Sequence, residues 1–145
     1  MATYSLSNLR TQIKNLLTAI TDIQFVSATK TSKIQGYPAV IFDITDENNK
    51  VLDSGNNERV VIFTLWVICT IGDLNDTNIL NATNLLDNIS QEVVNVLESK
   101  ANLGMGGYSD WVTPTSGQRQ QVQTPDGNIF YKEIKLECHI GVSIT

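Results

Sequence analysis

The segment from Arg59 to Ile71 constrains the fold more than any other part of the chain. Its side chains alternate between two faces, as they do along a β-strand. One face is wholly apolar and consists of Val61, Phe63, Leu65, Val67, Cys69 and Ile71. The other consists of Val60, Ile62, Thr64, Trp66, Ile68 and Thr70. This second face is mostly apolar too, so we expect another part of the chain or a neighbouring subunit to cover it.

Two amphipathic helices are predicted, one before this strand and one after it. In the first, apolar residues recur at spacings of three and four from Leu6 to Ile20, and Ser5 or Ser7 can cap the start. The second runs from about Thr77 to Ser99. Its apolar stripe consists of Ala82, Leu85, Leu86, Ile89, Val93, Val96 and Leu97. We expect both helices to meet the wholly apolar face of the strand.

Shorter β patterns complete the predicted fold. Strands are expected near residues 23–28 and 39–44, and a C-terminal hairpin is expected to start at 108–113 and to turn at 125–128. Two polar segments, Asp46–Glu58 and Pro114–Gln123, are predicted to be long loops. The order α-β-β-β-α-β-β predicts one α+β domain over residues 1–145, with two helices packed on one face of an antiparallel or mixed sheet.

Charge and hydropathy narrow the functional classes. The net charge is −5, which argues against a dedicated nucleic-acid binder. Residues 1–42 carry +3 and residues 43–145 carry −8, so one end of a subunit could face the opposite end of a neighbour. There is no apolar run typical of a signal peptide or a membrane span. We therefore expect a protein that is made in a cytoplasm and has no membrane partner.

The residues that could carry chemistry are few. His139 is the only histidine, and alternation along its strand turns it away from Cys138 towards the wet face. Cys69 and Cys138 lie in apolar runs and are expected to be reduced core residues, with a contact between them left open. We expect no enzyme activity, no bound metal and no cofactor. Two other classes stay open: an enzyme with a scattered carboxylate site, and a small-ligand-binding α+β domain.

Three segments in this order resemble a known family: VVIFTLWVICTIGD, NATNLLDNISQEVVNVLES and IFYKEIKLECHIGV. The chain resembles the tail terminator (tail completion) proteins of long-tailed bacteriophages, and the resemblance covers nearly the whole chain in element order. Other ring-forming head–tail connector or neck proteins are similar enough to remain rivals.

The resemblance implies a structural virion protein of the phage tail or neck. Such a protein forms a ring, expected to be a hexamer, that caps the tail tube, ends tube polymerisation and joins the head connector. Its partners would be copies of itself, the tail tube protein and the head connector protein. DNA would pass through the lumen without specific binding, and an acidic chain suits that passage.

Candidate contact residues follow from charge and loop placement. We expect Arg10 and Lys14 to lie near acids of a neighbouring subunit, with Asp87 or Glu92 as candidates, because rings need two complementary patches on each subunit. Trp66 is a further interface candidate, although a core position is the more ordinary place for a tryptophan. The candidates for contact with the tail tube or connector lie in the second polar segment and are Gln118, Arg119, Gln120 and Gln121.

Overall fold

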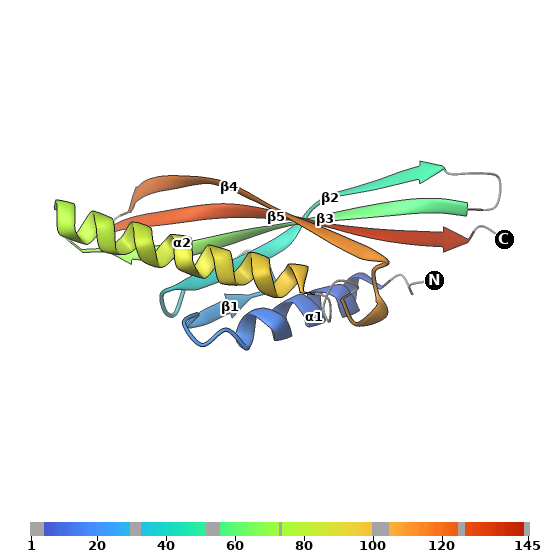
Figure 1. The fold of residues 1–145 in the computed structure, drawn as a ribbon, viewed down its shortest axis with the longest axis horizontal. Helices are drawn as coiled ribbons and strands as arrows, with labels where there is room; N and C mark the ends of the chain where they lie inside the picture. Colours follow the sequence, from blue (N-terminus) through green and yellow to red (C-terminus); the bar gives the residue numbers. More distant parts are fainter. Residues whose placement is uncertain are drawn as a thin grey trace.

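A computed structural model describes residues 5–29, 33–51, 56–72, 74–99, 105–124 and 127–143. The elements, in chain order, are α1 (Leu6–Thr18), β1 (Phe25–Ser27), β2 (Ala39–Val51), β3 (Asn56–Ile71), α2 (Asp76–Glu98), a 3₁₀ turn η1 (Met105–Gly107), β4 (Trp111–Thr124) and β5 (Gly127–Ser143). Apart from this 3₁₀ turn, the order is the one that the sequence predicts (Figure 1).

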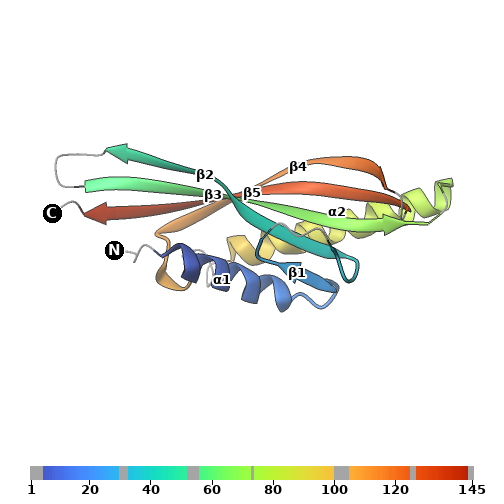
Figure 2. The same cartoon turned by 180° about the vertical axis from the view of Figure 1, so that it is seen from behind.

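The strands form one five-stranded mixed sheet in the order β1-β2-β3-β5-β4. β1 runs parallel to β2, and every other neighbouring pair is antiparallel. Both helices lie on the same face of the sheet (Figures 1 and 2). The predicted α+β architecture, with two helices on one face of a mixed sheet, is therefore confirmed.

The core lies between the helices and the apolar face of β3. All six residues of that face are buried, with exposed fractions of 0–7%. The helices contribute Leu9, Ile13, Leu17, Ala82, Leu86, Ile89, Val93 and Leu97. Leu85 was predicted to belong to this stripe but is 40% exposed, because it lies at the flank of the helix face that contacts the sheet. Each fully buried Leu, Ile or Phe contributes about 1.5–3 kcal/mol relative to an exposed one.

Both helices begin at a polar cap. The Asn8 amide donates to Ser5 Oγ at 3.3 Å, and the Asn78 amide donates to Asn75 Oδ1 at 2.9 Å. Each cap satisfies a backbone N–H that has no partner within its own helix. Among the described residues, no helix combines the length and apolar character that crossing a membrane requires.

The two predicted long loops are wrong, because both segments are largely strand. β2 continues to Val51 and β3 begins at Asn56, so most of Asp46–Glu58 is a hairpin, whose residues 52–55 lie outside the described part. Pro114–Gln123 lies within β4 and pairs with β5. Backbone hydrogen bonds to neighbouring strands hold both segments, and such bonds do not require apolar side chains.

The ends of three strands extend beyond both helices and form an arm, defined here as residues 46–51 of β2, 56–60 of β3 and 139–143 of β5 (Figures 1 and 2). Cross-strand pairing continues through the arm, from Asp46 opposite Ile62 to Val51 opposite Asn57. The arm gives the molecule an elongated shape, with α2 reaching towards the opposite end of the sheet.

Candidate assembly surface

The face of the sheet that points away from the helices is called the open face here. The register of β2, β3, β4 and β5 places on it Ile41, Val60, Ile62, Thr64, Trp66, Ile68, Trp111, Tyr131, Glu133, Glu137 and His139. Both described helices lie on the other side (Figure 2). The second face of β3, which the sequence suggests should be covered, therefore has no helix over it within the described part of the chain.

The centre of the open face is apolar and shielded by its own large side chains. Ile41 lies opposite Trp66 and Ile68 lies opposite Tyr131, and each isoleucine is only 7% exposed. Trp66 itself is half-buried, and its Nε1 donates to Glu133 Oε1 at 3.2 Å. Trp66 is therefore outside the helix-covered core, and its apolar ring and polar edge suit a contact surface.

A cluster around His139 lies on the open face at the base of the arm. Its Nδ1 is 2.8 Å from Glu58 Oε1 and its Nε2 is 3.4 Å from Glu137 Oε2. The imidazole is stacked on Trp111, with ring centroids 4.6 Å apart and planes inclined by 11°. These contacts link β3, β4 and β5 and leave His139 half-buried, less exposed than a histidine on a wet face would be. Both ring nitrogens therefore face carboxylates, an arrangement that links neighbouring strands of the sheet.

The two cysteines are core residues, as the sequence predicts. Burial raises the pKa of Cys69 to about 11 and that of Cys138 to about 12, so neither is a ready nucleophile. They do not meet, because Cys138 lies opposite Val61, eight residues from Cys69 along β3. That separation is about 26 Å at the rise of a strand. Within the described ranges, no group of His, Cys, Asp and Glu residues is arranged to hold a metal ion.

Two of the four charged interface candidates have partners within the chain. Arg10 Nη2 lies 3.3 Å from Asp43 Oδ1, and Asp87 Oδ1 lies 3.4 Å from Lys132 Nζ. Ion pairs that are still partly exposed, as these are, contribute about 0–1 kcal/mol and can be exchanged for others. Lys14 and Glu92 are exposed. The predicted contact between these residues and a neighbouring subunit remains a prediction.

The four candidates for contact with the tail tube or connector are exposed, but they lie on strand β4 and not on a long mobile loop. The chain passes through a bulge between Ser116 and Arg119. Gly117 fits there because a Cβ atom would lie 3.1 Å from the Glu133 carbonyl oxygen. Beyond the bulge, the Arg119 guanidinium lies 4.1 Å from the centroid of the Phe130 ring, a cation–π contact that holds this side chain against the sheet.

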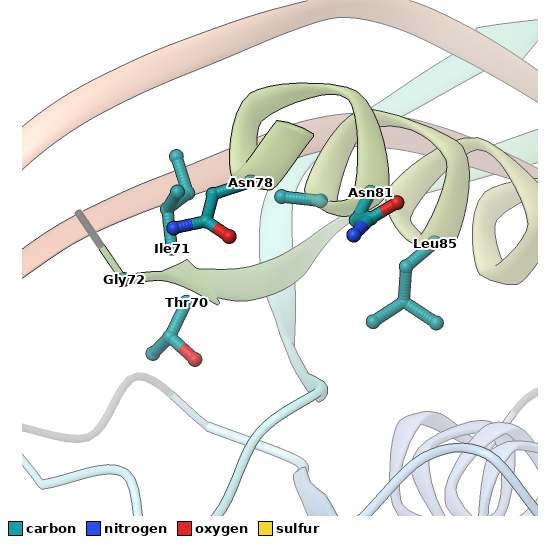
Figure 3. A pocket seen from close by; sticks show the side chains of 7 residues that line it. Thr70, Ile71, Gly72, Asn78, Asn81 and Leu85 are labelled. Carbon is teal, nitrogen blue, oxygen red and sulfur yellow. The ribbon is translucent and has the colours of Figure 1, made fainter. Parts of the chain in front are cut away.

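Two of the hollows among the described residues border the helix layer. One, near the end of β3 and the first turns of α2, has a volume of about 220 Å³ (Figure 3). It is lined by Thr70, Ile71, Gly72, Asn78, Asn81, Ala82 and Leu85. The other, between α1 and β1, has a volume of about 240 Å³. Both are smaller than the roughly 300–1,000 Å³ of typical small-molecule sites, so neither favours a ligand-binding function.

Comparison with known proteins returns no matching family model and no matching curated protein sequence.

Proposed function

We propose that the chain is a non-catalytic structural subunit that assembles into a ring, a tail terminator of a long-tailed bacteriophage. In this role a ring, expected to be a hexamer, caps the tail tube, stops the addition of tube subunits and provides the joint to the head connector. The protein would belong to the virion tail or neck and would need no cofactor.

The open face is the observation that carries this proposal. It presents the tryptophans Trp66 and Trp111, together with half-buried Val60, Ile62 and Tyr131, and no described helix covers it. Aromatic side chains of this kind are enriched at the centres of protein interfaces. A sheet with an apolar inner face and an aromatic outer face is typical of a subunit that is completed by its neighbours.

The elongated shape of the molecule allows the head-to-tail contacts that a ring requires. The arm extends from one end of the sheet, whereas α2 reaches towards the other end (Figure 1). Two unlike ends allow head-to-tail contacts, in which one patch of a subunit binds a different patch of the next, and such contacts close into rings when the rotation allows. The net charge of −5 suits a channel that lets DNA pass without gripping its phosphates.

The proposal is tested by electron microscopy of the purified chain, alone and mixed with polymerising tail tube protein from the phage that encodes it. We expect rings with a central channel wide enough for duplex DNA, and tubes that carry one such ring at a single end. Tube length in the mixture should fall as the concentration of the chain rises. A chain that neither forms rings nor binds tube ends would refute the proposal.

The same experiment separates the terminator from a head–tail connector or neck ring. A connector would form rings but bind the head portal assembly and leave the growth of tail tubes unchanged.

A substitution of Trp66 by Ala tests the role of the open face, because Trp66 lies on that face and outside the helix-covered core. We expect this variant to fold and to lose ring assembly.

A further inference from the structure

Two strand edges of the sheet have no partner strand among the described residues. β4 is the last strand in the order β1-β2-β3-β5-β4, so its outer edge is open. On the opposite side, β1 pairs only with Ala39–Ile41, and β2 continues to Val51 without an outer neighbour in the described part. Open edges present rows of backbone N–H and C=O groups that can pair with another chain.

We infer that the outer edge of β2, over residues 43–51, pairs with the outer edge of β4 from a second copy of this chain. The pairing joins the sheets of neighbouring subunits into one continuous sheet. This inference rests on the proposed ring and names an edge contact between its subunits, separate from the open face.

The strand directions suit this pairing. β2, β3, β5 and β4 alternate in direction, so β4 runs opposite to β2. When two copies are related by rotation about an axis roughly along the strands, β4 of one copy meets β2 of the next in antiparallel orientation. The two edges belong to different strands, so the contact is heterologous and can be repeated around a ring.

The charges of the two edges are complementary. Residues 43–51 carry Asp43, Asp46, Glu47 and Lys50, which give a net charge of −2, whereas β4 carries Arg119 as its single charge. Arg119 lies over Phe130 on the helix side of the sheet, and Glu47 lies opposite Val61 on the same side. In a continuous sheet these two side chains therefore project from the same face.

The register follows from the shape of β4. Pro114, which has no N–H, and the bulge between Ser116 and Arg119 interrupt the first half of its edge. Residues 119–124 form the regular remainder, and Gln120, Gln121 and Val122 are all exposed. We therefore place the intersubunit pairing on residues 119–124 of β4.

This register requires neighbouring subunits to be staggered along the strands. Within one chain Arg119 is level with Val67, whereas Glu47 is level with Val61, six residues away on β3. Six residues correspond to about 20 Å. Four strands are about 19 Å wide, and a tilt of about 45°, common in closed sheets, staggers them by about 19 Å. A closed ring of tilted strands therefore accommodates the pairing.

A charge exchange between the two edges tests the inference, with molar mass in solution and ring counts by electron microscopy as readouts. Arg119→Glu alone, and Asp46→Lys combined with Glu47→Lys, should each weaken assembly by about tenfold or more, because like charges then meet across the contact. The combination of all three substitutions should restore assembly to within about threefold of the wild type. The matched control is Glu98→Lys, which makes the same charge change as Glu47→Lys at an exposed position on α2, away from the open face and from both strand edges.

Hydrogen exchange provides an independent readout of the backbone. Amides in residues 43–51 and 119–124 that face the open edges should exchange at least tenfold more slowly in the ring than in the Arg119→Glu variant. Rings that persist in both edge variants would overturn the edge pairing and leave the ring itself standing. Equal loss of rings in the Glu98→Lys control would likewise overturn the edge pairing. A wild-type chain that remains monomeric overturns both. Protection that appears only when tail tube protein is added would assign the edge to that partner and likewise overturn the pairing between copies.

Discussion

Substitution of isoleucine by alanine on each face of the sheet distinguishes a core that is packed within one subunit from a surface that binds a partner. Ile134 on β5 is 0% exposed and lies opposite Leu65 on the helix side. Ile134→Ala should lower the free energy of unfolding by about 2–5 kcal/mol, since it removes buried methyl groups and leaves a cavity. Ile62 on β3 is half-buried on the open face opposite Glu137. Ile62→Ala should therefore lower the free energy of unfolding of the isolated chain by only about 1 kcal/mol.

The two variants should separate again when assembly is measured. Urea unfolding at low protein concentration reports the isolated chain, and sedimentation velocity at high concentration reports the ring. We expect Ile62→Ala to weaken assembly more than it weakens folding, and Ile134→Ala to do the reverse. Equal losses of several kcal/mol in the isolated chain would refute the reasoning, because they would mean that the open face is already packed within one subunit.

Three further predictions concern the cysteines, the histidine cluster and β4. Burial raises the pKa of Cys138 from 9.0 to about 12, so the native state keeps a proton that the unfolded chain loses. The free energy of unfolding should fall as the pH rises above about 9, and urea titrations should show a shallower fall for Cys138→Ala. A double-mutant cycle with His139→Ala and Glu58→Gln should give a coupling of about 1 kcal/mol in the free energy of unfolding of the isolated chain; a coupling of zero would show that this pair does not stabilise the sheet. Shortening residues 115–121 to a two-residue turn should destabilise the fold, because it removes the middle of a paired strand, and an unchanged urea midpoint would show the pairing to be dispensable.

The part of the fold in which the helices cover the sheet could be predicted from the spacing of apolar residues. The wholly apolar face of β3 and the helix stripe that includes Leu86 and Ile89 each show the period of their element, because burial against the other layer selects apolar residues at every turn or alternate position. Leu85 departs from the prediction because spacing does not define the width of a stripe. The caps Ser5 and Asn75 likewise follow from local chemistry.

The arm and β4 could not be predicted in the same way. Asp46–Val51 and Arg119–Gln121 carry polar side chains on both faces, so they have no apolar period, and their composition is that of a loop. Their strand structure comes from pairing with β3 and β5, which are distant in sequence. The cluster of Glu58, Glu137 and His139 was missed for the same reason, since Glu58 was assigned to a loop.

The segments whose strand structure the sequence patterns failed to predict also lie outside the core between the helices and the sheet. Apart from buried Ile140, the described side chains of the arm are mostly polar, so the arm gains little stability from burial and its pairing relies largely on backbone hydrogen bonds. An additional strand from a neighbour would add such bonds and shield the edge from water. A chain that retains long polar strands at both edges of its sheet is therefore suited to share them between copies, and the charge exchange between Arg119 and the acidic residues of β2 tests that step directly.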